Sequence, residues 1–397
     1  MTSVGDICLF ATLTRVATVI FGILSYTWTG SYDTSAEIIL PIDPAYNHLR
    51  FLNVFIRWDA IYFLHIAEHG YVYEQETAFF PFLPYLANYL SQTVFMPLQA
   101  VVGRQYTIVI VAALISNISF VFAAGYLFKL TRLIYPANTQ LAKYSAVAFC
   151  ISLPSMFMSA FYTESLFALL SFMGMYHITK QRYLLASILW GLASSTRSNA
   201  IIYAGFFIYE LIISRFRRHS LMSLIFGCFQ TALYSLITVS GFVAFQYSLY
   251  LQYCVDTSPE GPRPWCTRMP PLVYTYIQKE NWGNGFLAYY ELKQIPNFLL
   301  AMPVIGLSVA GLWTFISKDW KRWLSLGQSN HASSVILRFF TALPPLYWYI
   351  GHVWSLHLRS SASTTKYLHW LANGILYYSV LYSLIGVILF SAFLPPA

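Results

Sequence analysis

A short polar motif ahead of residue 60 holds the first residues able to do chemistry. Asp59 follows Arg57 and Trp58 and begins a stretch whose apolar residues recur at helical spacing. This pattern predicts a helix on the membrane surface, with Trp58 at the headgroups and Arg57 keeping the carboxylate ionised. Asp59 can then serve as a general base or only as a helix cap. Glu74, in a loop rich in carboxylates, is a second candidate base, and the residues alone do not rank the two.

Further charged groups occur where apolar runs of the chain are interrupted. Glu164 separates two apolar runs, and an ionisable group near membrane depth usually has a partner or a task. Arg197 and Asn199 break another apolar segment, so Arg197 can pair with Glu164 or bind a phosphate through its planar fork. His352 and Lys366 offer positive groups for a lipid phosphate, the alternative being that they only face headgroups.

The polar segment 252–294 has a different chemistry. Trp282 and amides such as Gln278 suit a sugar-binding surface, although an aromatic belt with ordinary turns would have the same composition. Cys254 and Cys266 share this segment, so a disulfide between them is expected if it faces an oxidising compartment.

The composition identifies the kind of protein that must position these groups. Of the 397 residues, 57% are apolar and only 10% are charged, against about 25% charged in an average soluble domain. The chain therefore reads as one all-α polytopic membrane domain over residues 1–397. Its net charge of +8 comes from short basic clusters beside apolar runs, which is typical of cytoplasmic loops and argues against nucleic-acid binding.

The apolar runs predict the membrane crossings. Candidate spans are 7–28, 107–128, 144–162, 164–179, 220–250, 295–317, 334–356 and 367–394. The first run, Ile7 to Trp28, is expected to be retained as a span and not cleaved as a signal peptide. The segment 183–214 is predicted to be a broken or re-entrant helix pair, because a polar stretch interrupts it.

Four basic clusters set the expected orientation. They are Lys129 with Arg132 and Lys143, Lys180 with Arg182, Arg215 with Arg217 and Arg218, and Lys318 with Lys321 and Arg322. Placing all four in the cytosol requires about ten crossings with both termini cytosolic. The loops on the other, lumenal side are then about 29–106, 252–294 and 357–366. The first of these is expected to be long and to carry amphipathic helices.

The motifs in their order also resemble a known family. They are Arg57-Trp58-Asp59 with Tyr62-Phe63, Glu68-His69-Gly70-Tyr71, Ala78-Phe79-Phe80-Pro81, Phe161-Tyr162-Thr163-Glu164-Ser165-Leu166-Phe167, Thr196-Arg197-Ser198-Asn199, Pro264-Trp265-Cys266 and Trp282-Gly283-Asn284-Gly285-Phe286. From about residue 51 onward they are similar to the GPI mannosyltransferase 2 family. The resemblance implies a GT-C-type glycosyltransferase of the endoplasmic reticulum membrane. It also implies dolichyl phosphate mannose as donor and an α-1,6 linkage to the first mannose of the GPI precursor.

Both substrates would then be lipid-linked, so the active site is expected at the lumenal interface. Inversion by a single displacement needs one base and a stabilised leaving phosphate, for which we expect Asp59 and Arg197, with His352 and Lys366 in reserve. No cofactor and no essential metal are expected, and whether a small membrane subunit is required stays open. Alternative functions are another transferase that uses a dolichol-phosphate sugar, or a lipid scramblase or transporter.

Overall fold

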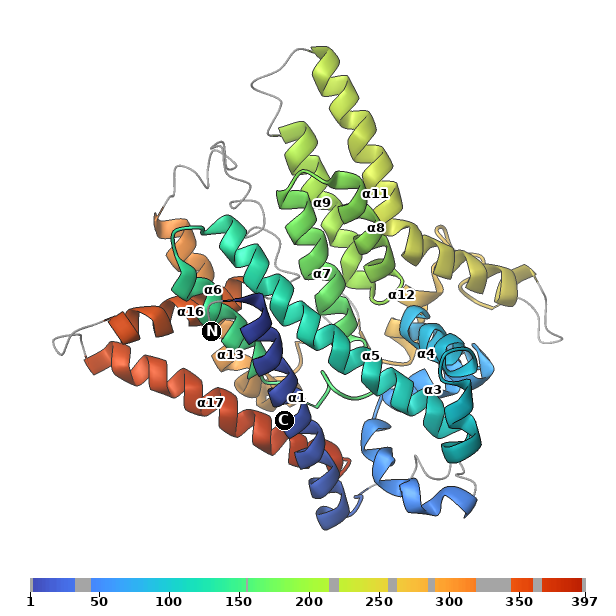
Figure 1. Cartoon of the computed structure of the whole chain (residues 1–397). Coiled ribbons are helices and arrows are strands. Elements are labelled where there is room, and N and C mark those ends of the chain that lie inside the picture. The colour runs from blue at the N-terminus through green and yellow to red at the C-terminus, as the bar shows by residue number, and fades with distance from the viewer. Residues whose placement is uncertain are drawn as a thin grey trace.

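The computed structural model describes residues 3–32, 44–154, 156–213, 221–255, 263–284, 290–318, 344–359 and 366–394. Within these ranges the chain consists of helices joined by turns, without a strand (Figure 1). Five of the described helical segments are long and apolar enough to cross a membrane. They are α1 (Val4–Thr29), α5 (Met96–Ile134), α11 with its π-helical end η5 (Leu221–Val255), the Leu292–Thr314 segment that includes most of α13 (Ile295–Lys318), and α17 (Lys366–Ser391).

These helices confirm a polytopic all-α membrane protein, while the expected count of about ten crossings stays a prediction. Shorter helices complete the bundle: α6 (Thr139–Cys150), α7 (Glu164–Thr179), α8 (Tyr183–Ser194) and α16 (Pro344–Arg359). The helix α7 packs between α5 and α8, and α8 packs on α11 (Figure 1). A Cβ at Gly191 would lie 2.6 Å from the Ile237 carbonyl oxygen, so this glycine permits the close approach of α8 and α11.

One predicted span is wrong, because residues 144–162 do not form a continuous helix. The helix α6 ends at Cys150, and an irregular stretch leads to the start of α7 at Glu164. Arg15 of α1 donates hydrogen bonds to the Cys150 carbonyl at 3.4 Å and to Ser159 Oγ at 3.3 Å. Irregular backbone at membrane depth is tolerated where protein groups supply its hydrogen bonds, and Arg15 supplies one to the Cys150 carbonyl.

The predicted break in the segment 183–214 is confirmed. The helix α8 ends at Ser194, and the chain resumes as the 3-10 helix η3 (Ser198–Tyr203), a short α9 (Ala204–Phe207) and the π-helical turn η4 (Ile208–Ile213). Arg197 therefore lies on the turn between α8 and η3, and Asn199 lies in the first turn of η3.

The long first loop is built from helical pieces: η1 (Pro44–Phe55), α3 (Ala60–His69), η2 (Glu74–Ala78) and α4 (Phe82–Gln92). The predicted helix after Asp59 is α3. However, Ala60, Phe63 and Leu64 are among six of its ten residues that are buried inside the protein. The apolar face of α3 therefore packs on the protein, and its position at the membrane surface stays a prediction. Next along the chain, α5 bends at Gly103, whose φ of +78° is a conformation that glycine adopts without strain.

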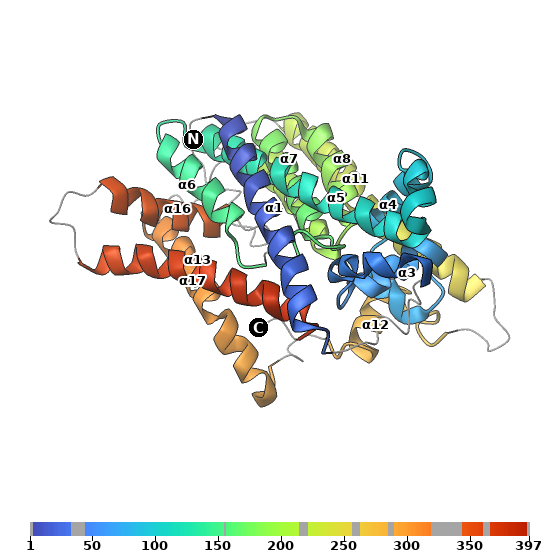
Figure 2. The same cartoon turned by 60° about the horizontal axis from the view of Figure 1, so that its bottom comes forward.

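The helix α17 ends beside the first loop. The Tyr32 N–H donates to the Ala392 carbonyl at 2.8 Å, and Ser391 Oγ donates to the Gly22 carbonyl at 3.1 Å. Figure 2 shows this end of α17 next to the C-terminal end of α1. Lys366, at the start of α17, lies 25 residues earlier and so roughly 37 Å along the helix.

The orientation of α16 agrees with that of α17. Tyr347 contacts Phe149 at 5.3 Å between ring centroids, and a Cβ at Gly351 would meet Ser145 and Leu141. The helix α16 thus runs antiparallel to α6 and ends near the α5–α6 connection. Of the predicted lumenal segment 357–366, residues 360–365 lie outside the described residues, so its placement on the same face as 29–106 stays a prediction.

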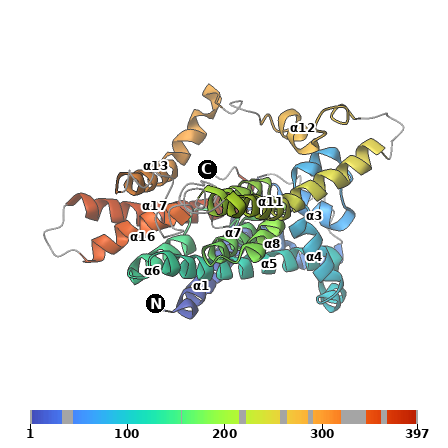
Figure 3. The ribbon, with the colours of Figure 1, turned by 90° about the horizontal axis from the view of Figure 1, so that it is seen from above.

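A second apolar cluster positions α12 (Val273–Glu280). Val273 and Ile277, one turn apart on α12, are buried against α3, the turn that follows η2 and the end of α11. The partners in this cluster are Ile66, Tyr71, Phe80, Phe245, Leu249 and Trp265. Figure 3 shows α12 near α3 and the end of α11, above the helix bundle.

Candidate functional site

The charged motifs meet in one cavity of about 190 Å³. Asp59 lines it from the turn before α3, Glu164 from the first turn of α7, Arg197 from the turn after α8, and Asn199 from the first turn of η3. These positions are far apart in the sequence, so only the packing of α3, α7 and α8 brings them together. Two carboxylates and one guanidinium thus share a small polar cavity.

The Asp59 side chain lines the cavity and does not cap α3. It precedes the first residue of α3, yet its side chain makes no capping hydrogen bond. The surrounding protein removes part of its hydration and, together with the charge of Glu164, raises the pKa of Asp59 from 3.8 to about 6, while Arg197 opposes the rise. A carboxyl group with that pKa is mostly ionised near neutral pH and can still accept a proton, as a general base must.

Glu164 and Arg197 form an ion pair at the wall of the cavity. Arg197 donates from one terminal nitrogen to Glu164 Oε1 at 2.6 Å. A guanidinium has five N–H groups, so the others remain for a ligand. The second oxygen, Glu164 Oε2, is buried without a hydrogen-bond partner among the described residues. In that same part of the chain no three His, Cys, Asp or Glu side chains are grouped as a metal site requires.

The lining of the cavity also includes a residue that was not predicted from the sequence. Tyr274 and Gln278, one turn apart on α12, both line the cavity. The Tyr274 hydroxyl accepts a hydrogen bond from Ser198 at 3.0 Å, and its backbone N–H donates to Gln246. The spacing of Tyr274 and Gln278, offset by one residue from the apolar pair of α12, is the only signal that could have found Tyr274.

Arg57 and Trp58 have other positions than expected. The Arg57 guanidinium lies over the rings of Tyr26 and Phe393, at 4.9 and 5.1 Å, and not beside the carboxylate. Trp58 stacks on Phe393 with centroids 5.1 Å apart, so it packs against the end of α17 and not on headgroups. Trp58 and Phe393 both have positive φ, at 54° and 61°, which is strained for side chains of this size. Both residues therefore hold the turn that carries Asp59, and their expected roles at the substrates stay predictions.

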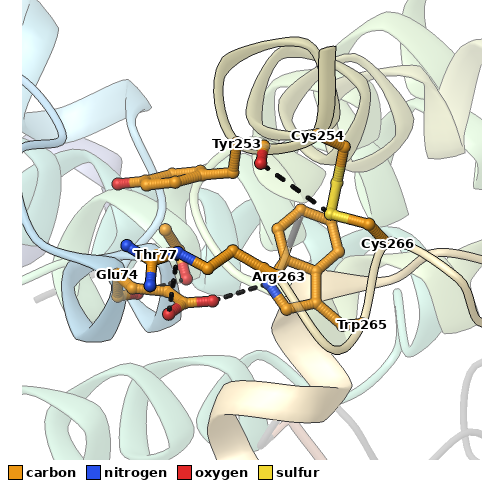
Figure 4. A network of polar contacts seen from close by, with 7 residues as sticks. All are labelled: Glu74, Thr77, Tyr253, Cys254, Arg263, Trp265 and Cys266. Atoms are coloured by element: carbon orange, nitrogen blue, oxygen red, sulfur yellow. Dashed lines mark hydrogen bonds and ion pairs between the residues drawn. A yellow bond between two sulfur atoms is a disulfide. The ribbon is translucent and has the colours of Figure 1, made fainter. Parts of the chain in front are cut away.

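Glu74 lies outside the cavity and binds the polar segment after α11. Its Oε1 accepts a hydrogen bond from Trp265 Nε1 at 2.6 Å, and its Oε2 lies 4.0 Å from Arg263 Nε (Figure 4). The same segment contains the disulfide expected between Cys254 and Cys266, whose Cα atoms are 5.7 Å apart. Glu74 and the disulfide together fix the chain that leads into α12.

Three further predicted site residues lie apart from the cavity. Trp282, just after α12, contacts Phe79 at the cavity wall, with centroids 5.9 Å apart. His352 on α16 and Lys366 at the start of α17 do not line the cavity. The expected role of His352 and Lys366 as reserve phosphate ligands stays a prediction.

Comparison with known proteins agrees with this arrangement. The chain is 38% identical to the GPI alpha-1,6-mannosyltransferase 2 of Cricetulus griseus over 68% of its own length and 59% of that protein. It is 31% identical to the GPI mannosyltransferase 2 of Schizosaccharomyces pombe, over 86% of this chain and 73% of that one. The chain thus spans about three fifths of the length of its mammalian relatives.

A solved structure shares the fold. The apo oligosaccharyltransferase of Archaeoglobus fulgidus superposes with a TM-score of 0.50 at 14% identity, over 98% of this chain and 56% of that one. This likeness concerns the fold alone. The family described as mannosyltransferase (PIG-V) matches residues 4–335. With the family match over most of its length and the relatives above, the chain belongs to the mannosyltransferase (PIG-V) family.

Proposed function

We propose that this protein transfers mannose from dolichyl phosphate mannose to the first mannose of the GPI precursor, forming an α-1,6 linkage. The observation that carries the proposal is the cavity in which Asp59, Glu164 and Arg197 meet. Membership of a mannosyltransferase family supports the reaction class, and the names of the relatives support the acceptor.

In this mechanism Asp59 removes the proton from the attacking hydroxyl of the acceptor mannose. The hydroxyl oxygen bonds to the anomeric carbon of the donor as the bond from that carbon to the phosphate oxygen breaks. Dolichyl phosphate leaves with the electron pair, and the configuration at the anomeric carbon is inverted. Asp59 has a suitable pKa of about 6.

Arg197 stabilises the leaving phosphate through the N–H groups that Glu164 does not use. Glu164 fixes the direction of the guanidinium. A monophosphate leaving group carries less charge than a nucleotide diphosphate, so we propose transfer without an essential metal ion.

The site is proposed to face the lumen of the endoplasmic reticulum, where both lipid-linked substrates meet it at the membrane interface. Support comes from the disulfide in the segment that leads to the cavity wall, because disulfides persist in oxidising compartments. A small membrane subunit is an additional partner that the proposal leaves open.

Purified protein in liposomes tests the function directly. With dolichyl phosphate mannose and a GPI precursor carrying one mannose, the wild-type protein should form the precursor with two mannoses. Depleting the protein from cells should accumulate the precursor with one. A protein that only moves lipids between leaflets, with no new sugar bond formed, would refute the proposal.

A further inference from the structure

Tyr162 is a buried tyrosine whose hydroxyl binds the turn that carries Asp59. It lies in the irregular stretch that precedes α7 and is 3% exposed. Its hydroxyl donates a hydrogen bond of 2.7 Å to the carbonyl of Arg57, 105 positions earlier in the chain. The backbone of Asp59 and of Ala60 also lies within hydrogen-bonding reach of the hydroxyl oxygen. One phenolic group thus contacts the turn on both sides of Trp58.

This turn needs support because its backbone is strained. Trp58 has a φ of 54°, in the left-handed region that large side chains rarely adopt. Such a turn persists only where its surroundings hold it. Arg57 and Trp58 are held through their side chains by the ring of Phe393, whereas Tyr162 binds the backbone itself. The hydroxyl therefore helps to set the direction in which the next side chain, that of Asp59, leaves the turn.

The same hydrogen bond joins the two segments that carry the carboxylates of the cavity. Asp59 precedes α3, and Glu164, two positions after Tyr162, begins α7. Tyr162 is itself fixed to the bundle, because Ser116 of α5 donates a hydrogen bond to its carbonyl at 3.2 Å. Loss of the bond from the Tyr162 hydroxyl would let Asp59 shift relative to Glu164 and its partner Arg197.

We propose that Tyr162 is a positioning residue for the transfer reaction, whose hydroxyl holds Asp59 where the base meets the acceptor. The inference rests on the proposed function and on the role of Asp59 in it. Tyr162 lines the cavity, but its hydroxyl proton is donated to the Arg57 carbonyl, so it acts through Asp59 and not on a substrate. A general base must stand within hydrogen-bond reach of the proton it removes, and a small displacement lowers the rate without weakening substrate binding.

Tyr162→Phe removes the hydroxyl and keeps the ring, which packs against Phe157 with centroids 4.9 Å apart. In the liposome assay, with activity expressed per amount of folded protein, kcat should fall about tenfold, as expected for the loss of one buried hydrogen bond. KM for donor and acceptor should change less than twofold. In an Asp59→Asn background the same change should alter transfer less than twofold, because the group that Tyr162 positions is already absent.

Tyr203→Phe is the matched control. Tyr203 is also buried, and its hydroxyl donates to Ser171 Oγ at 2.8 Å, but neither of these residues lines the cavity. Removing this hydroxyl should lower Tm as the loss of any buried hydrogen bond does, and should leave kcat within about twofold of wild type.

A loss of transfer that persists in full in the Asp59→Asn background would mean that Tyr162 acts on a substrate directly, which overturns the positioning role. A normal kcat for Tyr162→Phe, or a loss only in KM, would overturn it as well. If Tyr162→Phe does not reach the membrane, Ser116→Ala carries the same comparison, because it frees the Tyr162 carbonyl; its kcat should fall several-fold, and only when Asp59 is present. Wild-type protein that transfers no mannose would overturn the proposed function itself.

Discussion

Replacing Asp59 by asparagine removes the proposed base and changes little else around it. Asparagine has nearly the same shape, and no capping hydrogen bond of Asp59 exists to be lost. Removing a general base typically lowers the rate by about 10²–10⁴-fold. We therefore expect mannosyl transfer by Asp59→Asn to fall on that scale, while protein level and membrane insertion stay normal.

The raised pKa of Asp59 gives the same experiment a second readout. With a pKa of about 6, the wild-type carboxyl is about 90% ionised at pH 7 and about 10% ionised at pH 5, so kcat/KM should fall about tenfold between these values. An aspartate with its ordinary pKa of 3.8 would stay ionised and lose almost nothing. The acidic limb of the pH profile is expected near pH 6 and should be absent from the residual activity of Asp59→Asn.

As the pH rises through the pKa of Asp59, activity should increase and the contribution of Asp59 to folded-state stability should decrease. The folded-state pKa of Asp59 lies above its ordinary value, so the unfolded chain loses this proton first as pH rises. The contribution of Asp59 to stability is therefore highest below pH 3.8, falls between there and about pH 6, and stays low above that. Asparagine carries no charge, so the variant should unfold at the same or a slightly higher temperature at pH 7.

The decisive assay measures transfer from radiolabelled donor in liposomes, with protein quantified in the same samples. Asp59→Asn retaining activity within about tenfold of wild type would refute the role of base. A collapse in protein level would instead mean that the carboxylate has a structural function that the absent cap does not reveal.

Glu164→Gln removes a negative charge that helps to raise the pKa of Asp59. The acidic limb of the kcat/KM profile should therefore move to lower pH. An unchanged limb would contradict the electrostatic coupling between Glu164 and Asp59. Cys254→Ser opens a loop closed over a separation of 12 residues, and should cost about 3 kcal/mol of unfolding free energy, seen as a lower Tm. In a background without free cysteines, cysteines at Asn138 and His357 should be labelled from the same side of sealed vesicles and one at Asn47 from the other. Labelling of His357 together with Asn47 would disprove the orientation of α16.

The sequence predicted two charged residues of the cavity, Glu164 and Arg197, because each interrupts an apolar run. Glu164 and Arg197 are conspicuous for that reason, and the ion pair between them was one of two expected outcomes. Tyr274 was not predicted as a site residue because tyrosines are common near membrane interfaces. Only the packing of Val273 and Ile277 into the core shows that the other side of α12 faces a cavity.

One error about the helices has a definite physical cause. Hydropathy marked 144–162 as a span because it registers apolar side chains and not where backbone hydrogen bonds are made. Arg15 binds part of this segment from another helix. Such long-range contacts are not encoded as a local pattern in a single sequence.

The stacking of Phe393 on Trp58 also determines when during synthesis the site can form. A ribosome makes the chain from its N-terminus, so the Asp59 turn emerges early, and Phe393 follows 335 positions after Trp58 (from 58 to 393). Until α17 has entered the membrane, the ring that holds Trp58 in its strained conformation is missing. Formation of the site is therefore a late event: earlier helices can insert one by one, but the Asp59 turn is completed only after α17 and Phe393 have been made.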